Sequence, residues 1–525
     1  MRNNRPRSLQ AGSSAAFHFR RRFVPAAILL SAATLGGCVV GPKYHTPSAP
    51  VPTATTYKEN PTNFPGAQNW KVAAPSDAML RGKWWEIFQD PELNALEQQI
   101  DSGNQTIAQA YQNYIAARAI IREARSQYYP TLAGSGSVTR SHASSNLGGN
   151  VGSGGVNGAG AGKDVNFYML SGDATWEPDL WGKVRNQVNQ ARYNAQVSAA
   201  DLENVRLSEQ SSVAQLYFQI RGQDALQKIF DDTVVADKKT VDYAQAQYEV
   251  GVGDRISYVE AQSALQSAEA AAINVGLSRA QFEHAIAVML GKTPDQFAIP
   301  KRPLEAVPPS VPVGLPSQLL ERRPDVAAAE RTMAAANAQI GIAYAAYYPN
   351  ITLSATGGFE SSATGNWFSW PSRFWSIGVN ASETIFDAGL RRATVNQFIA
   401  TYNADVAGYR QTVLTAFQQV EDFLAAERIL SQQTEKQKDA VGSAQEFFNL
   451  EYDRYQTGID PYVNVLTAQN TLLTDQQALA NLQTQRMTSV VQLIAALGGG
   501  WDRTDLPTPA QVSVNPTPGT EKIQQ

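Results

Sequence analysis

Two stretches of the sequence repeat one another: QTIAQAYQNYIAARAIIREARSQYYPTL at residues 105–132 and PDVAAAERTMAAANAQIGIAYAAYYPNI at residues 324–351. They align without a gap at a shift of 219 residues, and both carry Tyr-Tyr-Pro near their ends. Further along, the shift becomes 207, where YEVGVGDRISYVEAQSAL (248–265) matches YQTGIDPYVNVLTAQNTL (455–472). The Gly- and Ser-rich stretch 141–163 absorbs the difference of 12 residues and is typical of a surface loop. We therefore expect an internally duplicated fold.

Two long segments without proline predict unusually long helices. Pro178 and Pro294 bracket the first, and Pro371 and Pro461 bracket the second. Both segments are rich in Ala, Gln, Leu and Glu, which favour helix. Residues 183–249, taken as one helix, would extend for about 100 Å at 1.5 Å per residue. A plain helical bundle or coiled-coil spacer would give the same pattern.

Alternating apolar and polar residues after Tyr-Tyr-Pro predict strands in both halves. The alternation is clear over 351–360 and 374–382 in the second half and over 168–176 in the first. The segment after Pro130 is Gly-rich and gives a weaker pattern. A soluble sheet with one face on a core would alternate in the same way. Aromatic residues near the strand ends favour outer-membrane strands instead: Phe359, Trp367, Trp370, Trp375 and Trp176.

Four strands per chain are too few to close a barrel around a pore. A pore built from these strands needs copies from several chains, and the strand count alone does not fix how many. Past the N-terminal region, no run of 18 or more apolar residues occurs that would predict a transmembrane helix. If the protein spans a membrane, it must therefore do so with strands.

The N-terminus resembles a lipoprotein signal peptide. Residues 1–22 contain six arginines and no acidic residue, and a short apolar run over 23–35 follows. Leu35-Gly36-Gly37-Cys38 then forms a lipobox, which predicts cleavage before Cys38 and acylation of its thiol. An ordinary buried cysteine behind an ordinary signal is the alternative. Cys38 is the only cysteine in the chain, so the mature protein would carry no free thiol in an oxidising compartment.

Charge and composition exclude several classes of function. Removing the six signal arginines leaves 37 basic and 47 acidic residues, a net charge of about −10, which argues against a nucleic-acid partner. The four histidines lie far apart, and no pair has metal-binding spacing. No Gly-x-Ser-x-Gly motif or phosphate-binding loop occurs. The sequence therefore predicts no enzyme and no cofactor beyond the lipid on Cys38, so the energy for any transport must come from a partner.

Four further motifs carry a resemblance to a known family. They are CVVGPKYHTP (38–47), WWEIFQDPEL (84–93), LLERRPDV (319–326) and ALGGGW (496–501). In this order, and together with the duplication, they resemble the outer-membrane efflux proteins of the TolC/OprM superfamily, and most closely the NodT-type lipoproteins. The resemblance covers about residues 38–501.

The resemblance implies a mixed α and β fold in a homotrimer. Three chains with four strands each would form a twelve-stranded transmembrane β-barrel in the outer membrane, continued by a long α-helical barrel across the periplasm. Such channels dock a periplasmic adaptor of the membrane-fusion class and an inner-membrane pump, often of the resistance-nodulation-division class. They export small molecules such as drugs. Two alternatives stay open: a type I protein-secretion channel, and a periplasmic lipoprotein scaffold that never spans the membrane.

The resemblance also divides the chain. We expect a signal peptide at 1–37, a lipid-anchored extension at 38–90, a first efflux-protein repeat at 91–293, a Pro-rich connector at 294–316, a second repeat at 317–501 and a C-terminal tail at 502–525.

Two glycine turns are the predicted docking tips. They comprise Gly251, Val252, Gly253 and Asp254 in the first repeat and Gly458, Ile459 and Asp460 in the second. A plain helix hairpin needs such turns in any case, because glycine supplies a positive φ. The resemblance implies that they are also periplasmic tips, where the adaptor docks and the tunnel closes.

The predicted periplasmic aperture lies just past the second turn. The resemblance places Thr467 where relatives carry an acidic ring, with Val463 one turn before it and Asn470 after it. Relatives often carry charged residues at these positions, so this chain departs from the pattern, and we expect an uncharged ring that holds cations less strongly. The resemblance also matches Glu260 and Tyr455 to an acid and a tyrosine that bond each other. We expect a Glu260–Tyr455 latch, although a solvated helix face would equally explain Glu260.

Overall fold

The computed structural model describes residues 39–50, 57–59, 82–142, 144, 164–309, 311 and 319–514. The fold is mixed α and β, as predicted. The chain divides into a strand unit (residues 1–42, 125–187 and 339–396) and a helical unit (residues 43–124, 188–338 and 397–525). Cys38 and the signal peptide lie outside the described residues.

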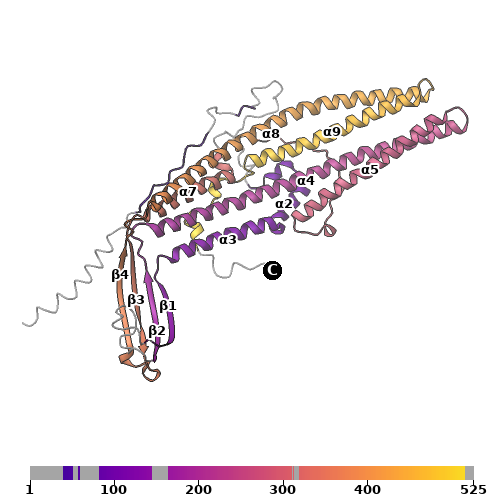
Figure 1. Cartoon of the computed structure of the whole chain (residues 1–525). Helices are drawn as coiled ribbons and strands as arrows, with labels where there is room; N and C mark the ends of the chain where they lie inside the picture. The colour runs from indigo at the N-terminus through magenta and orange to yellow at the C-terminus, as the bar shows by residue number, and fades with distance from the viewer. Residues whose placement is uncertain are drawn as a thin grey trace, which may run out of the picture. The chain divides into compact units, whose positions relative to one another are not determined.

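The strand unit contains one antiparallel sheet in the order β1-β2-β3-β4 (Figure 1). Its strands are β1 (Thr131–His142), β2 (Asp164–Trp176), β3 (Asn350–Ser361) and β4 (Arg373–Ser382). The strands predicted from alternation are confirmed, and the Gly-rich segment after Pro130 is a full strand as well.

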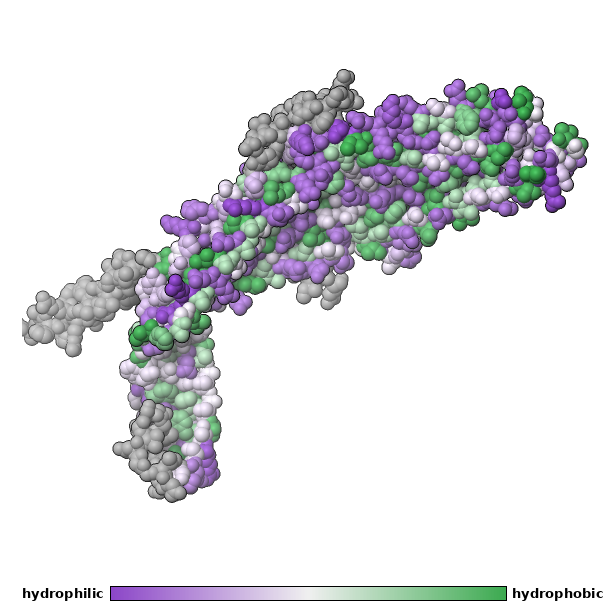
Figure 2. All heavy atoms as spheres, turned by 45° about the horizontal axis from the view of Figure 1, so that its top comes forward, coloured by the Kyte–Doolittle hydropathy of each residue, from purple (hydrophilic) through white to green (hydrophobic). Residues whose placement is uncertain are grey.

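The two faces of the sheet differ in polarity. Strand register places Leu132, Ala174, Ala355 and Ile377 on one rung of the same face. Leu132 and Ile377 are 81% and 75% exposed, so this apolar face has no core beneath it within the described chain. In Figure 2, hydrophobic and neutral residues cover most of the visible surface of the sheet, and hydrophilic residues gather at the end that lies lowest in this view. The sheet therefore does not rest one apolar face on a core, which was the soluble alternative.

The other face of the sheet is polar. The hydroxyls of Ser135 and Ser171 lie 2.8 Å apart, and Thr356 donates to the Asp173 carboxylate at 2.8 Å. Asp173 thus links β2 to β3 through side chains as well as through the backbone ladder.

The helices reproduce the duplication in length. The paired elements are α3 (Gln105–Ser126) and α7 (Pro324–Ala345), each of 22 residues; α4 (Lys183–Glu249) and α8 (Leu390–Gln456), each of 67; and α5 (Arg255–Met289) and α9 (Tyr462–Ala496), each of 35. The helix predicted over 183–249 is confirmed residue for residue. None of the helices in the described part of the chain is both long and apolar enough to cross a membrane.

The repeats differ where α2 (Pro91–Gly103) precedes α3, because only the four-residue α6 (Leu319–Arg322) precedes α7. Short 3₁₀ helices complete the described elements: η3 (Trp84–Phe88), η4 (Pro294–Gln296), η6 (Thr364–Asn366), η7 (Trp370–Ser372), η8 (Arg503–Asp505) and η9 (Gln511–Ser513). The main core of the helical unit packs η3 and α2 against α4, with Trp84, Leu93 and Tyr217 fully buried.

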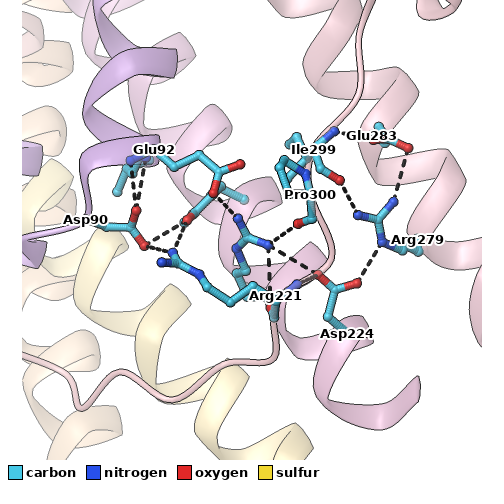
Figure 3. Close-up of polar contacts among 11 residues, drawn as sticks. Asp90, Glu92, Arg221, Asp224, Arg279, Glu283, Ile299 and Pro300 are labelled. Carbon is cyan, nitrogen blue, oxygen red and sulfur yellow. Dashed lines mark hydrogen bonds and ion pairs between the residues drawn. The ribbon is translucent and has the colours of Figure 1, made fainter. Parts of the chain in front are cut away.

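A buried polar cluster fixes the start of α2 and the segment after α5 to α4 (Figure 3). Arg221 on α4 is 2% exposed and donates to the Pro300 carbonyl at 2.6 Å and to Asp224 at 3.3 Å. It also pairs with Glu92 at the start of α2. Arg279 on α5 pairs with Asp224 at 2.7 Å. Because each buried charge has an opposite partner, the cluster avoids the large cost of an isolated buried ion.

Candidate aperture at the hairpin tips

Two helix hairpins, α4–α5 and α8–α9, end in turns of the same design. Gly251 and Gly458 adopt φ angles of +77° and +73°, which lie in the left-handed region. In the first turn the next backbone N–H, that of Val252, donates to the Gln247 carbonyl at 3.0 Å, and Ile459 makes the matching bond at 2.9 Å in the second. This is a Schellman motif, in which glycine reverses the chain while the last helical carbonyls stay satisfied.

The two turns differ in how the following helix begins. Asp254 caps α5 by accepting from the backbone N–H of Ser257 at 2.7 Å. Hydrogen bonds from the backbone and the side chain of Ser257 hold the pKa of the Asp254 carboxyl below its usual value. Pro461 precedes α9 and offers no side-chain cap. Asp460 instead pairs with Arg454, and the hydrogen bond from this guanidinium lowers the pKa of Asp460.

Apolar side chains are exposed at both tips. Val252 and Ile256 are 80% and 68% exposed at the first tip, and Ile459 is 63% exposed at the second. These side chains have little packing within the described residues, so each tip offers an apolar surface of a few residues bordered by charged groups.

A small hydrophobic cluster joins the two hairpins just behind their tips. Tyr455, Tyr462 and Val465 of the second hairpin pack with Ala244 and Ala261 of the first. The rings of Tyr455 and Tyr462 lie 5.4 Å apart, and burial raises the pKa of both phenols. The hydroxyl of Tyr462 is buried without a hydrogen-bond partner in the described chain.

The structure gives Tyr455 a different partner from the one predicted. Its hydroxyl donates to the Gln247 side-chain carbonyl at 3.5 Å, within one chain. Glu260 is half-buried near the same cluster, where its charge contributes to the raised pKa of Tyr462. A Glu260–Tyr455 bond is therefore not formed in the described chain, because Gln247 on α4 occupies the hydroxyl. Such a bond between copies stays a prediction.

The predicted aperture residues share one exposed face of α9. Val463, Thr467 and Asn470 are all exposed, and their spacing of four and three residues aligns them along the helix. The Thr467 hydroxyl donates to the Val463 carbonyl at 2.8 Å, so its hydrogen is held by its own helix. The opposite face of α9, with Tyr462 and Val465, is buried. None of the three aperture residues carries a charge.

Two amide–carboxylate bonds of the same type lie near these hairpins. Gln469 on α9 donates to Asp237 on α4, which joins the two hairpins. Gln437 on α8 donates to Asp475 on α9 at 3.0 Å, which joins two helices of the same hairpin. Asp237 is 2% exposed, and burial raises its pKa while the amide of Gln469 opposes that shift.

Sequence reasoning missed Gln247, Asp237 and Gln469. The repeat carried a signal for Asp237 alone, because a shift of 207 aligns Asp237 with Ala444 but Gln469 with the identical Gln262. An acid that replaces alanine at a buried helix position marks a difference between the repeats.

The comparisons with known proteins identify the class. The family model for outer membrane efflux proteins matches residues 96–292 and 315–499, one match in each repeat. The chain therefore belongs to the outer membrane efflux protein family.

Its relatives match it over nearly their whole length. The toluene efflux pump outer membrane protein TtgC of Pseudomonas putida is 32% identical over 475 residues, which cover 90% of this chain and 95% of the relative. The antibiotic efflux pump outer membrane protein ArpC of Pseudomonas putida matches with the same identity and coverage, 32%, 90% and 95%. Among solved structures, the outer-membrane channel OprN is 26% identical with a TM-score of 0.78, covering 88% of this chain and all of that one.

Proposed function

We propose that this protein is the outer-membrane exit duct of an efflux pump that exports small hydrophobic molecules. The observation that carries the proposal is the apolar, exposed face of the four-stranded sheet in a chain that matches efflux channels over nearly their whole length. Hydrocarbon is the environment that suits such a face, since its strands satisfy their backbone groups within a sheet.

The proposed assembly has three copies. The sheet order leaves β1 and β4 as edges within the described chain, and a sheet edge presents unpaired backbone groups that pair with another strand. Joining β4 of one copy to β1 of the next closes a ring, and three copies give a twelve-stranded barrel. The helical hairpins of the copies would then form the periplasmic tunnel.

Three further parts of the proposal concern the pump in which the duct works. Acylation of Cys38 would anchor each N-terminus in the outer membrane. The tips around Gly251–Asp254 and Gly458–Asp460 would dock a periplasmic adaptor, with exposed Val252 and Ile459 supplying apolar contact. An inner-membrane pump, of the resistance-nodulation-division class, would supply the energy.

A periplasmic scaffold is less well supported, because it has no use for a sheet whose apolar face is exposed. A protein-secretion channel would use the same barrel, but the relatives are named for toluene and antibiotic efflux.

The aperture of this duct would be uncharged. Val463, Thr467 and Asn470 are exposed along α9 and would line the closed end of the tunnel. We expect Thr467→Asp to raise cation selectivity and block by multivalent cations in planar bilayers, because three carboxylates would then meet at the axis. The matched control is Thr471→Asp, one turn further along α9. An equal effect from both variants would contradict an aperture at Thr467.

Growth inhibition of a deletion strain tests the function. The panel should include hydrophobic antibiotics, dyes, detergents and aromatic solvents, with the wild-type gene as complementation. We expect hypersensitivity to hydrophobic compounds that the gene reverses. Unchanged sensitivity in a strain that also lacks its other outer-membrane efflux channels would contradict the proposal, and a change in secreted proteins would favour the secretion role.

A further inference from the structure

The apolar face of the sheet carries cationic side chains at one of its ends. The two arginines of the described strands, Arg140 on β1 and Arg373 on β4, both lie at this end. Strand alternation puts Arg140 and His142 on the same face as Leu132, and it puts Arg373 on the same face as Ile377. Because Leu132 and Ile377 belong to the apolar rung, the face that we propose to contact lipid ends in cations.

The position of these cations along the strand corresponds to the border of the membrane. Arg140 lies eight residues beyond Leu132 on β1, which is about 27 Å along an antiparallel strand. Strands of outer-membrane barrels are tilted by about 40°, so this length covers about 20 Å of an apolar band that is about 25 Å tall. Arg140 and His142 are both exposed. They therefore lie where lipid headgroups begin.

Arg140 and His142 share one carboxylate. Asp164 on β2 accepts from the Arg140 guanidinium at 2.6 Å, and its other oxygen lies 2.7 Å from Nδ1 of His142. The other acidic residues of the described strands, Asp173 and Glu360, alternate onto the polar face. Asp164 is therefore the only carboxylate on the apolar face of these strands.

Arg373 has no acidic partner in the described part of the chain. Its guanidinium lies over the ring of Trp370, and its Nε donates to the Trp370 carbonyl at 3.3 Å. These contacts hold the side chain in place, while its two terminal nitrogens make no hydrogen bond to any described residue. The loops at this end of the sheet, residues 143–163 and 362–372, contain no acidic residue in their sequence.

Closing the ring of copies brings Arg373 beside β1 of the next copy. β4 has 10 residues and β1 has 12, so antiparallel pairing along the whole of β4 puts Arg373 opposite one of residues 140–142. A register that keeps the apolar side chains on one face excludes position 141, which alternates to the other face. Arg373 of one copy therefore lies opposite Arg140 or His142 of the next.

This pairing needs a further negative charge. Like charges directly opposite one another destabilise a pair of strands, and Asp164 supplies one carboxylate for both arginines. An anion bound between the strands would remove the repulsion. Phosphate suits the site, because a guanidinium donates two parallel hydrogen bonds to phosphate oxygens. At the border of the apolar band, phosphate is a component of lipid headgroups.

We propose that each junction between copies binds the phosphate of a lipid headgroup, through Arg373 of one copy and Arg140 and His142 of the next. The proposal rests on the proposed function, because the site is complete only in a ring of copies. The helices α3, α4, α7 and α8 adjoin the opposite ends of the strands along the chain. With these helices in the periplasm, the site faces the outer leaflet of the outer membrane.

Binding of diphosphorylated lipid A to the assembled protein in detergent tests the site. We expect Arg373→Gln and Arg140→Gln each to weaken binding about tenfold, because each removes a charged hydrogen bond to phosphate. Arg373→Lys keeps a cation and should bind more tightly than Arg373→Gln. The matched control is Arg392→Gln, which removes an exposed arginine beyond the other end of β4 and should leave binding unchanged.

Three results would overturn the proposal. Equal affinity for the same lipid without its phosphates would show that the apolar face alone holds the lipid. Unchanged binding in Arg373→Gln would show that this residue is no part of the site. Inorganic phosphate that binds as tightly as the lipid would indicate a site for free anions instead of a lipid site.

Cross-linking separates a failure of this site from a failure of the duct. Arg373→Cys with Arg140→Cys, joined by a short bis-maleimide, should give covalent trimers, because β1 and β4 are the two edges of the sheet within one chain. Ser141→Cys with Arg373→Cys is the control, since Ser141 lies on the opposite face, and it should link much less. Cys38 is the only native cysteine and is the proposed lipid site, so it adds no free thiol.

The two outcomes of the cross-linking have different meanings. If no pair links any two copies, the ring itself is wrong, and the proposed function fails together with the site. If Arg373→Cys links to Arg140→Cys but lipid binding does not depend on phosphate, the ring stands and the lipid site alone is wrong.

Discussion

The two repeats have the same helix lengths and differ in the side-chain contacts that they make. Their paired helices have identical lengths, 67 residues for α4 and α8 and 35 for α5 and α9. Yet Asp237 in the first repeat is buried and bonded, whereas its counterpart Ala444 is only buried. Helix length and turn geometry are thus the same in both repeats, while individual side chains at equivalent positions make different contacts.

A second pair of positions shows the same principle. Arg221 on α4 and Arg428 on α8 are equivalent at a shift of 207. Arg221 holds the segment after α5 through the Pro300 carbonyl, and Arg428 holds Glu59 in the N-terminal extension at 2.8 Å. The same arginine therefore fastens a different connecting segment to each repeat.

Substituting these two arginines should give the largest difference in the free energy of unfolding between equivalent positions of the two repeats. Arg221→Ala leaves Glu92 without its cation and removes a buried side chain, while Asp224 keeps Arg279, and we expect a loss of about 3 kcal/mol. Arg428→Ala should cost only about 1 kcal/mol, because its pair with Glu59 is partly exposed. Thermal unfolding in detergent measures both, and equal losses would contradict the difference in burial.

A glycine in the sheet gives the next comparison. Gly358 on β3 corresponds to Thr139 on β1 at a shift of 219. A Cβ at Gly358 would lie 2.0 Å from the Leu170 carbonyl oxygen, so Gly358→Thr should cost about 1–3 kcal/mol and reduce the yield of assembled protein in the outer membrane. Gly172→Ala is the control, since its nearest atom lies at 3.9 Å. Normal assembly of Gly358→Thr would contradict the register.

Glu97 lies on α2, the helix without a full counterpart in the second repeat. It is fully buried, and neither carboxylate oxygen has a hydrogen-bond partner in the described chain. Burial, and to a smaller degree the charge of Asp101, raises the pKa of Glu97 well above its usual value. The folded state therefore binds this proton more tightly than the unfolded state, so stability should fall as pH rises from the usual glutamate range toward the raised pKa.

Glu97→Gln removes the titrating group and should therefore remove its part of the pH dependence. That part changes the free energy of unfolding by at most about 1.4 kcal/mol per pH unit. Melting temperatures from pH 4 to 8 measure it, with the exposed Glu86 as the control in Glu86→Gln. A pH dependence that is the same in wild type and Glu97→Gln would show that Glu97 titrates normally.

The tip glycines should show the smallest effect and no difference between repeats. Gly251 and Gly458 share a left-handed φ, and an added Cβ would meet no atom within 4 Å at either position. Gly251→Ala and Gly458→Ala should therefore each cost about 1 kcal/mol, through backbone strain alone. Unequal losses would show that one of the tips is packed in the assembled protein.

Much of this fold could be predicted from the sequence because its signals are local. Proline-free segments gave α4 and α8, alternation gave three strands, and Gly251 and Gly458 marked the turns. The strand after Pro130 was less clear, since glycines at 134 and 136 weaken its pattern.

The side-chain partners could not be predicted, because they depend on how the helices pack. The long helices have weak, Ala-rich stripes, so the sequence does not show which neighbour Asp237 or Arg221 faces. Tyr455 illustrates the point: its hydroxyl donates to Gln247 on α4, although the resemblance to the family predicts Glu260 as its partner.

The number of chains per complex, measured on protein extracted from the outer membrane, tests the proposed duct most directly. Native mass spectrometry of the full-length protein gives this number, since the mass of a complex divided by that of one chain counts the copies. We predict three chains in one complex, because β1 and β4 are open edges in the described chain and three four-stranded sheets close a twelve-stranded barrel. A stable single chain would contradict the duct.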